Sequence, residues 1–230
     1  MLRARFAIGV VAVLVVVSNA AWSVPSTGGG SDKALLKAGA LRAKDVPASW
    51  KSASVSGGFS NALQGVSGCE EQSAALDLRQ RRAASRAFYD PTTRGTAGFT
   101  TQASNVARVF KDTAAAGQFM SAYKADSAGA CLQQVNESDL KRRNPSADIS
   151  ITSVAPVTGL PPTGDDNIGY ELVITLTSEQ PPRTAYMDLV WVQVGRVVVG
   201  SKVVSEQSQF VSQQPDIVGN PVERVDKAEK

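Results

Sequence analysis

The sequence predicts an α+β fold, a single domain in which a twisted antiparallel β-sheet packs against helices from the first half of the chain. Helical patterns occur mostly before residue 146, whereas the segments after it are dense in Val, Ile and Thr, which favour strands. Helices gathered in one half and strands in the other indicate an antiparallel sheet with helices on one face, not alternating βαβ units. The length of 230 residues and the hydrophobic fraction of 43% suit one globular domain with short extensions.

Residues 1–23 have the pattern of a secretory signal peptide or an N-terminal membrane anchor. Arg3 and Arg5 give a basic start, a Val-rich apolar run follows, and small residues lead to Ser23. The apolar run is slightly shorter than the roughly 20 residues that a spanning helix needs, so cleavage and anchoring both stay open. Either outcome places the protein outside the cell, secreted or anchored at the outer face of the cytoplasmic membrane. Residues 24–32 include three consecutive Gly and predict a flexible linker.

The folded domain is predicted to cover residues 33–205. Its first helix is expected over 33–44, with Asp32 as the N-cap, because Leu and Ala residues recur there at helical spacing. A second helix is expected over 69–84. Its Glu residues come early and its Arg residues late, as the helix dipole favours.

A strand pair and a long helix are expected in the middle of the chain. The β-forming segments 85–90 and 98–111 flank a turn-rich stretch, which predicts two paired strands. Near the end of the second strand, apolar residues point to both faces, namely Val106 and Phe110 to one and Ala107 and Val109 to the other. Both faces of this strand should therefore be covered. The longest helical pattern covers 113–140, where Asp112 can cap the start and Gly129 can divide the helix.

The second half of the domain predicts four further strands. Their expected ranges are 149–155, 170–176, 184–194 and 196–204. The last two should form a hairpin, because Gly195 can adopt the positive φ that a tight turn requires. Residues 206–230 are polar, contain Pro and Gly, and predict a loose tail.

Cys69 and Cys131 are the only cysteines. An even pair in an exported chain predicts a disulfide, because such compartments are oxidising. Closing a loop of about 62 residues would stabilise the fold by roughly 4 kcal/mol through the entropy of the unfolded chain.

The absence of histidine limits the chemistry that the chain can carry. Ser-His-Asp and Cys-His catalysis and His-containing zinc sites are excluded, and we expect no catalytic residue, no metal site and no cofactor. A serine- or carboxylate-dependent hydrolase is the alternative, since Ser121 and Lys124 match the S-x-x-K spacing. The companion S-D-N and K-T-G elements are absent, however. Asp165, Asp166 and Asn167 could ligate calcium, although such residues are also typical of turns.

Charge gives one binding signal. The formal net charge of +3 falls to about +1 if the leader is removed, so the domain lacks the electrostatic footprint of a nucleic-acid-binding protein. A basic patch is predicted from Arg79, Arg81, Arg82 and Arg86, with Lys141, Arg142 and Arg143 as further members. This patch could face an anionic envelope polymer or lipid headgroups, or dock a membrane-protein partner as a structural adaptor would.

Several segments together resemble a known family. They are 41–50, reading LRAKDVPASW, then Cys69, 104–110, reading SNVARVF, 114–119, and Cys131 with Leu132. On these residues the chain resembles the secreted proteins and lipoproteins of actinobacteria that are similar to the extracellular sensor domain of mycobacterial receptor serine/threonine kinases. The resemblance covers about 33–205. The chain departs from the kinase sensors in having one cysteine pair instead of two, and from the lipoproteins in lacking the lipid-modified cysteine.

The resemblance implies a twisted antiparallel sheet flanked by helices, with a cleft for a small envelope ligand. Together with the leader, the cysteine pair and the missing catalytic constellations, it predicts an exported binding or sensing domain of the cell envelope without catalytic activity. The sequence does not name the ligand.

Overall fold

The computed structural model of the protein describes residues 30–53, 63, 65–85, 87–93, 100–160, 163–177 and 182–230. Within these residues the fold has six α-helices, one short 3-10 helix and an eight-stranded antiparallel sheet, which confirms the α+β fold class. The predicted leader, 1–23, lies outside the described residues. The first helix begins at Gly30, so the last three residues of the predicted linker are helical. Among the helices that are described, none has the length and apolar character needed to cross a membrane.

One antiparallel sheet forms the centre of the molecule. Its strands are β1 (Lys51–Ala53), β2 (Arg79–Ala84), β3 (Ala87–Tyr89), β4 (Gln102–Phe110), β5 (Ile149–Pro156), β6 (Asp166–Leu176), β7 (Arg183–Val194) and β8 (Val197–Ser205). They run in the order β1-β3-β4-β8-β7-β6-β5, and β2 pairs with β4 alongside β3. The predicted β7–β8 hairpin is confirmed, with Gly195 at φ +52° in its turn.

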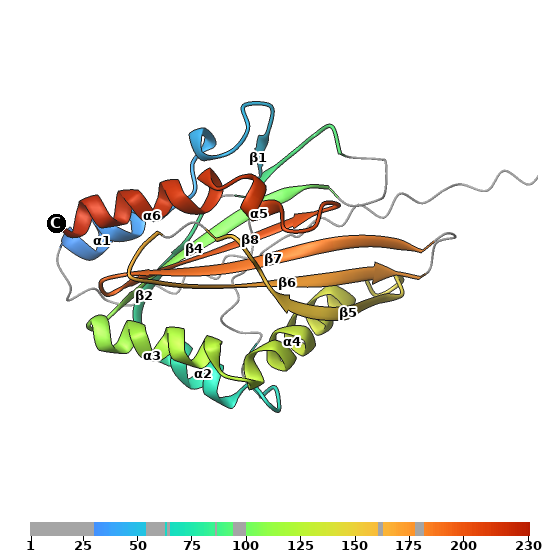
Figure 1. Ribbon diagram of the computed structural model, residues 1–230, viewed down its shortest axis with the longest axis horizontal. Helices are drawn as coiled ribbons and strands as arrows, with labels where there is room; N and C mark the ends of the chain where they lie inside the picture. The colour runs from blue at the N-terminus through green and yellow to red at the C-terminus, as the bar shows by residue number, and fades with distance from the viewer. Residues whose placement is uncertain are drawn as a thin grey trace, which may run out of the picture.

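Helices cover both faces of the sheet (Figure 1). We call one the α3 face, covered by α2 (Glu70–Asp77), α3 (Thr113–Lys124) and α4 (Ser127–Arg143), and the other the α6 face, covered by α1 (Gly30–Ala38), α5 (Phe210–Gln213) and α6 (Asp216–Glu229). The prediction of helices on one face is therefore wrong. Both faces are covered because β7 and β8 have apolar residues at consecutive positions, which point to both sides of the sheet and are buried on each.

All three predicted helices have different bounds. The first, expected over 33–44 with Asp32 as its N-cap, is Gly30–Ala38, so Asp32 lies within the helix, where its carboxylate accepts a hydrogen bond from Arg196. The helix expected over 69–84 ends at Asp77, and the Arg-rich remainder is strand β2, because pairing with β4 overrides its helical propensity. The long helix expected over 113–140 is divided, but at Ala125, which has extended backbone (φ −63°, ψ 151°), and not at Gly129. Its predicted cap is confirmed, since Asp112 accepts a hydrogen bond from the Ala115 N–H at 2.8 Å.

The segment 206–230 is not a loose tail. It contains α5 and α6, and the domain extends through α6. The apolar side of α6 is buried against the sheet and consists of Ile217, Val218, Val222 and Val225. Arg224 fixes the same helix to the start of the domain through two hydrogen bonds to the Asp45 carboxylate, at 2.8 and 2.7 Å. The helical spacing of those four apolar residues is the signal that the polar composition of the segment obscured.

The predicted disulfide is present in the structure. Cys69 and Cys131 are joined with an S–S distance of 2.08 Å. Cys69 is the N-cap of α2 and Cys131 lies in α4, so the bridge ties the two helices together on the α3 face.

Candidate functional site

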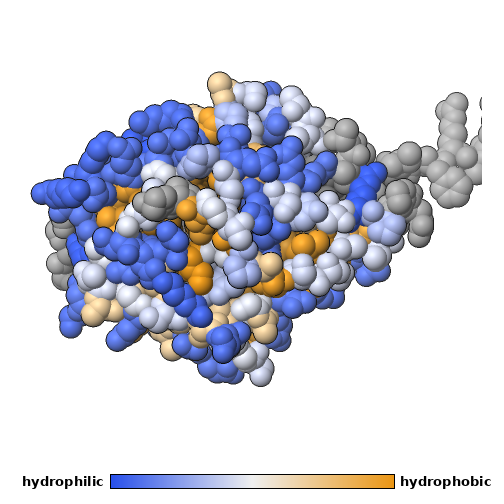
Figure 2. Space-filling model, in the orientation of Figure 1, coloured by the Kyte–Doolittle hydropathy of each residue, from blue (hydrophilic) through white to orange (hydrophobic). Residues whose placement is uncertain are grey.

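The described surface is mostly hydrophilic. Figure 2 shows hydrophobic residues on the viewed face mainly in a middle band between the two helical layers. Leu78 is the one large hydrophobic side chain that is exposed among the described residues. Charged and polar groups are thus the features that could mark a site in this part of the chain.

The α3 face holds a buried arginine. Side chains on β4 alternate between the two faces of the sheet, so Arg108 shares the α3 face with Phe110, while Val109 points to the α6 face. Only 1% of the Arg108 surface is exposed. Because a buried cation is unfavourable unless it is paired, its partners decide what role it can have.

The Arg108 guanidinium lies against the Phe119 ring, at one end of a chain of aromatic contacts. Its Cζ lies 5.5 Å from the centroid of the Phe119 ring, a distance at which cation–π attraction operates. The rings continue from Phe119 to Tyr123 and from Tyr123 to Trp191, with centroid distances of 4.6 and 4.5 Å. Gly200 leaves room here, since a Cβ atom at this position would lie only 3.1 Å from Arg108 Nη1. The guanidinium thus lies between the Phe119 ring of α3 and the sheet at Gly200.

The N–H groups of Arg108 are not all satisfied. Its Nε and Nη1 atoms are buried and have no hydrogen-bond partner among the described residues. Burial lowers the pKa of Arg108 to about 10; Tyr123 opposes this shift, and Arg79 and Arg82 add to it. No carboxylate of the described part is among the groups that shift the pKa of Arg108. The site therefore combines a buried positive charge with donors that an anion could satisfy.

The predicted basic patch is divided between the two faces of the sheet. Arg82 lies opposite Arg108 in the β2–β4 ladder and therefore on the α3 face, where its side chain is exposed. Arg81 points to the opposite face, and its Nε lies 3.8 Å from an Asp32 carboxylate oxygen. Arg79, Arg81 and Arg82 belong to the segment 69–84 that the sequence predicts as a helix, whereas neighbouring residues of a strand point in opposite directions.

The remaining members of the predicted patch are not brought into one surface either. Arg79 donates a hydrogen bond to the Leu76 carbonyl oxygen, and Arg86 lies outside the described residues. The basic residues of 141–143 are on α4, where each pairs with an acidic residue of the same helix. Arg79 and Arg82 instead lie near enough to Arg108 for their charges to lower its pKa. The one sequence signal for Arg108 is a charged residue among apolar neighbours in the segment 104–110.

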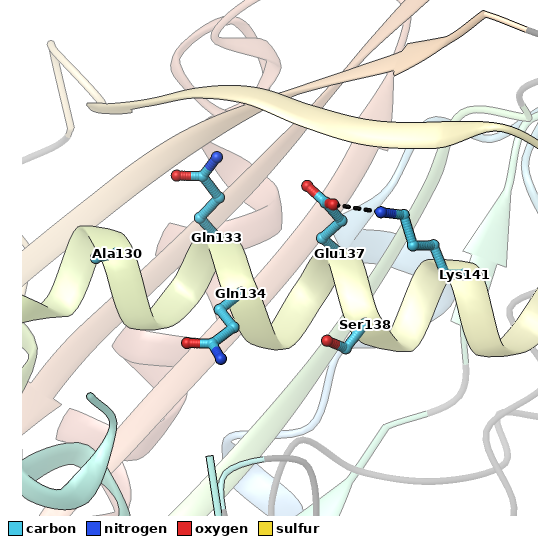
Figure 3. Close-up of a pocket in the computed structure, with 6 residues that line it drawn as sticks. All are labelled: Ala130, Gln133, Gln134, Glu137, Ser138 and Lys141. Atoms are coloured by element: carbon cyan, nitrogen blue, oxygen red, sulfur yellow. Dashed lines mark hydrogen bonds and ion pairs between the residues drawn. The ribbon is translucent and has the colours of Figure 1, made fainter. Parts of the chain in front are cut away.

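A shallow pocket of about 290 Å³ lies beside α4 (Figure 3). It is lined by Ala130, Gln133, Gln134, Glu137, Ser138 and Lys141. Gln133 donates to the Ile151 carbonyl oxygen at 2.7 Å, and Glu137 accepts from the Ile151 N–H at 2.8 Å. Figure 3 shows both side chains pointing from α4 to the same side, and a Lys141–Glu137 ion pair of 2.6 Å beside them. These polar groups cover the edge of β5, which is a structural use.

The S-x-x-K pair and the Asp-rich loop also have structural partners. Lys124 Nζ lies 2.5 Å from Asp166 Oδ1, while Ser121 is exposed on α3. Asp165 accepts a hydrogen bond from the Gly195 N–H at 2.6 Å and so supports the β7–β8 turn. Within the described residues, no group of three or more His, Cys, Asp or Glu side chains could hold a metal ion.

Comparison with known proteins gives little. No protein-family model matches the chain, and no curated protein matches it. Among solved structures, the crystal structure of a Pseudomonas aeruginosa protein of unknown function is similar over 60% of this chain and 79% of the other. The two chains are 13% identical and their TM-score is 0.23, which is too low to show a shared fold.

Proposed function

We propose that the protein is an exported binding or sensing domain of the cell envelope that holds a small anionic ligand, with Arg108 as its charged anchor. One observation carries the proposal: the Arg108 guanidinium is buried, and two of its nitrogen atoms have no hydrogen-bond partner in the part of the chain that the structure describes. We propose further that the domain does not catalyse a reaction. The Ser121–Lys124 alternative receives no support, because Lys124 is paired with Asp166.

The energetics of a buried charge support an anionic ligand. A polar group that loses water without gaining a partner destabilises the fold by about 1–3 kcal/mol, and by more when it is charged. A carboxylate or phosphate oxygen would offset this by accepting charge-assisted hydrogen bonds from the guanidinium fork. The exposed side chain of Arg82, opposite Arg108 in the ladder, would attract such an anion to this part of the sheet.

The proposed location rests on the sequence. The basic and apolar leader pattern of 1–23 supports export, and a disulfide suits an oxidising compartment. The resemblance to actinobacterial envelope proteins with a kinase-sensor-like domain supports a small envelope ligand. The adaptor alternative loses its proposed surface, because Arg81 and Arg82 point to opposite faces of the sheet.

The test compares ligand-free protein with protein given molecules from its own envelope. The full mature chain is denatured to remove bound molecules, refolded with the disulfide intact, and mixed with the anionic or the neutral fraction of a small-molecule envelope extract. The anionic fraction should raise the thermal unfolding midpoint, because a ligand that binds only the folded state stabilises it by mass action. The neutral fraction should not.

Two variants make the test specific to the site. Arg108→Met should abolish the response to the anionic fraction, while Arg142→Met, at a position whose side chain is 72% exposed, should keep it. An equal response of Arg108→Met and wild type would remove Arg108 as the anchor. A response to the neutral fraction alone would overturn the anionic ligand.

A further inference from the structure

Two acidic side chains lie next to each other on the α6 face, away from Arg108. Glu171 on β6 and Asp188 on β7 are directly paired in the sheet, so their side chains share a face. Their exposed fractions are 8% and 1%. Like charges at directly opposite positions of two strands are unfavourable, and burial increases that repulsion.

Both carboxyl groups hold one short segment of chain. Glu171 accepts hydrogen bonds from Ser208 Oγ, at 3.0 and 2.9 Å, and from the Gln209 N–H. Asp188 Oδ2 accepts from the Val211 N–H at 3.0 Å. Gln209 has φ +51° and is the one non-glycine residue in the described part with positive φ, so this corner needs external support.

The surroundings of Asp188 favour its protonated form. Burial raises the pKa of Asp188 to about 6, the Glu171 charge raises it too, and the backbone N–H groups of Val211 and Phe210 oppose the shift. Glu171 is the one ionisable side chain of the described part that acts on it. Glu206 belongs to the segment 206–213 and has a buried Oε1 atom without a partner among the described residues, but it does not shift the pKa of Asp188.

We propose that Glu171 and Asp188 form a proton-operated clasp on residues 206–213. With one proton on the pair, only one negative charge is present and the segment is held closed. When the proton leaves, the two adjacent buried carboxylates repel each other and the segment opens. The domain would then respond to the acidity outside the membrane through a site on the α6 face, independently of the proposed anion site on the α3 face.

Opening the clasp would change the surface of the domain. Val211 is fully buried in the apolar core of the α6 face, and Phe210 stacks on Trp50 with ring centroids 6.1 Å apart. Both residues lie in α5, directly after the clasped corner. Release would therefore expose apolar surface between β1 and α6 that is covered in the closed state.

The test is hydrogen exchange of the backbone amides of Gln209 and Val211 in the full chain, followed by NMR and expressed as protection factors. The pKa of Asp188 is about 6 when the segment is closed and near the ordinary 3.8 when it is open. This difference makes opening of the segment about tenfold more frequent at about pH 7.5 than at about pH 5. Asp188→Asn should abolish this dependence, because an amide keeps the acceptor for Val211 and removes the titration. Glu171→Gln should weaken the dependence without abolishing it, because burial, the largest cause of the raised pKa of Asp188, remains.

A matched control separates the clasp from general pH effects. Asp112→Asn alters an exposed carboxylate that caps α3, so the pH dependence at Val211 should stay as in wild type. Equal protection of Gln209 and Val211 at both pH values in wild type would overturn the proposal. So would an unchanged dependence in both Asp188→Asn and Glu171→Gln.

Discussion

Replacing Arg108 by methionine should make the ligand-free protein more stable. The pKa of this fully buried group falls from 12.5 to about 10, and about 1.4 kcal/mol per pKa unit gives a penalty on the order of 3 kcal/mol for the charged form. Attraction to the Phe119 ring offsets roughly 0.5–2 kcal/mol of this. Methionine has a similar reach and no polar hydrogen to satisfy, so we expect the free energy of unfolding to rise by about 1–3 kcal/mol.

The assay is equilibrium unfolding in urea, followed by tryptophan fluorescence, with the disulfide intact. Trp191 is buried against Tyr123 and should report on the α3 face. The expected gain corresponds to a rise of roughly 2–12 °C in the thermal midpoint of a domain of this size. Arg142→Met, on the surface of α4, should stay within about 0.5 kcal/mol of wild type.

A second substitution separates the charge of Arg108 from its shape. Arg108→Lys keeps a buried cation but loses the planar guanidinium, so it should be no more stable than wild type. A loss of more than about 1 kcal/mol in Arg108→Met would refute the reasoning, because the guanidinium would then be a net stabilising part of the core.

Three further predictions concern stability. The partners of the Cys69–Cys131 disulfide are 62 residues apart, so reducing it should lower the free energy of unfolding by about 4 kcal/mol. Urea titrations with and without reductant measure this difference. A loss below about 1 kcal/mol would contradict the chain-entropy account. The folded-state pKa of Asp188 is raised to about 6, so wild-type stability is highest at low pH and falls as the pH rises from about 4 to 6 and Asp188 loses its proton. Asp188→Asn should therefore be about 2–3 kcal/mol more stable than wild type near pH 7.5 and equal to it near pH 4. Calorimetry that shows the reverse order would contradict this sign. Arg224→Met should destabilise the fold by about 3–5 kcal/mol by leaving the Asp45 carboxylate buried without its partner, and the double variant with Asp45→Asn should recover part of that loss in thermal unfolding.

The fold class could be predicted because composition changes along the chain. Val-rich segments such as 197–204 favour strands strongly, and the glycine at position 195 marks the hairpin. The second helical layer could not be predicted in the same way. The segment 206–230 has a polar average composition, and only the spacing of its few Val and Ile residues places α6 on the sheet.

The candidate site was harder to predict than the fold. Arg79, Arg81 and Arg82 form a charge run that is visible in the sequence. Because side chains alternate along a strand, Arg81 points to the face opposite Arg82 and pairs there with Asp32. Arg108 and Asp188 each occupy a position in a mostly apolar strand. Their burial, and the missing hydrogen-bond partners of Arg108, arise from contacts between segments far apart in the chain.

The most direct test of the proposed anion site is native mass spectrometry of wild-type and Arg108→Met protein, each purified from its own cell envelope and measured before and after denaturation. We predict that wild type carries a noncovalent adduct with acidic groups that leaves on denaturation, and that Arg108→Met carries none. A bare wild-type protein, or the same adduct on both proteins, would contradict the account.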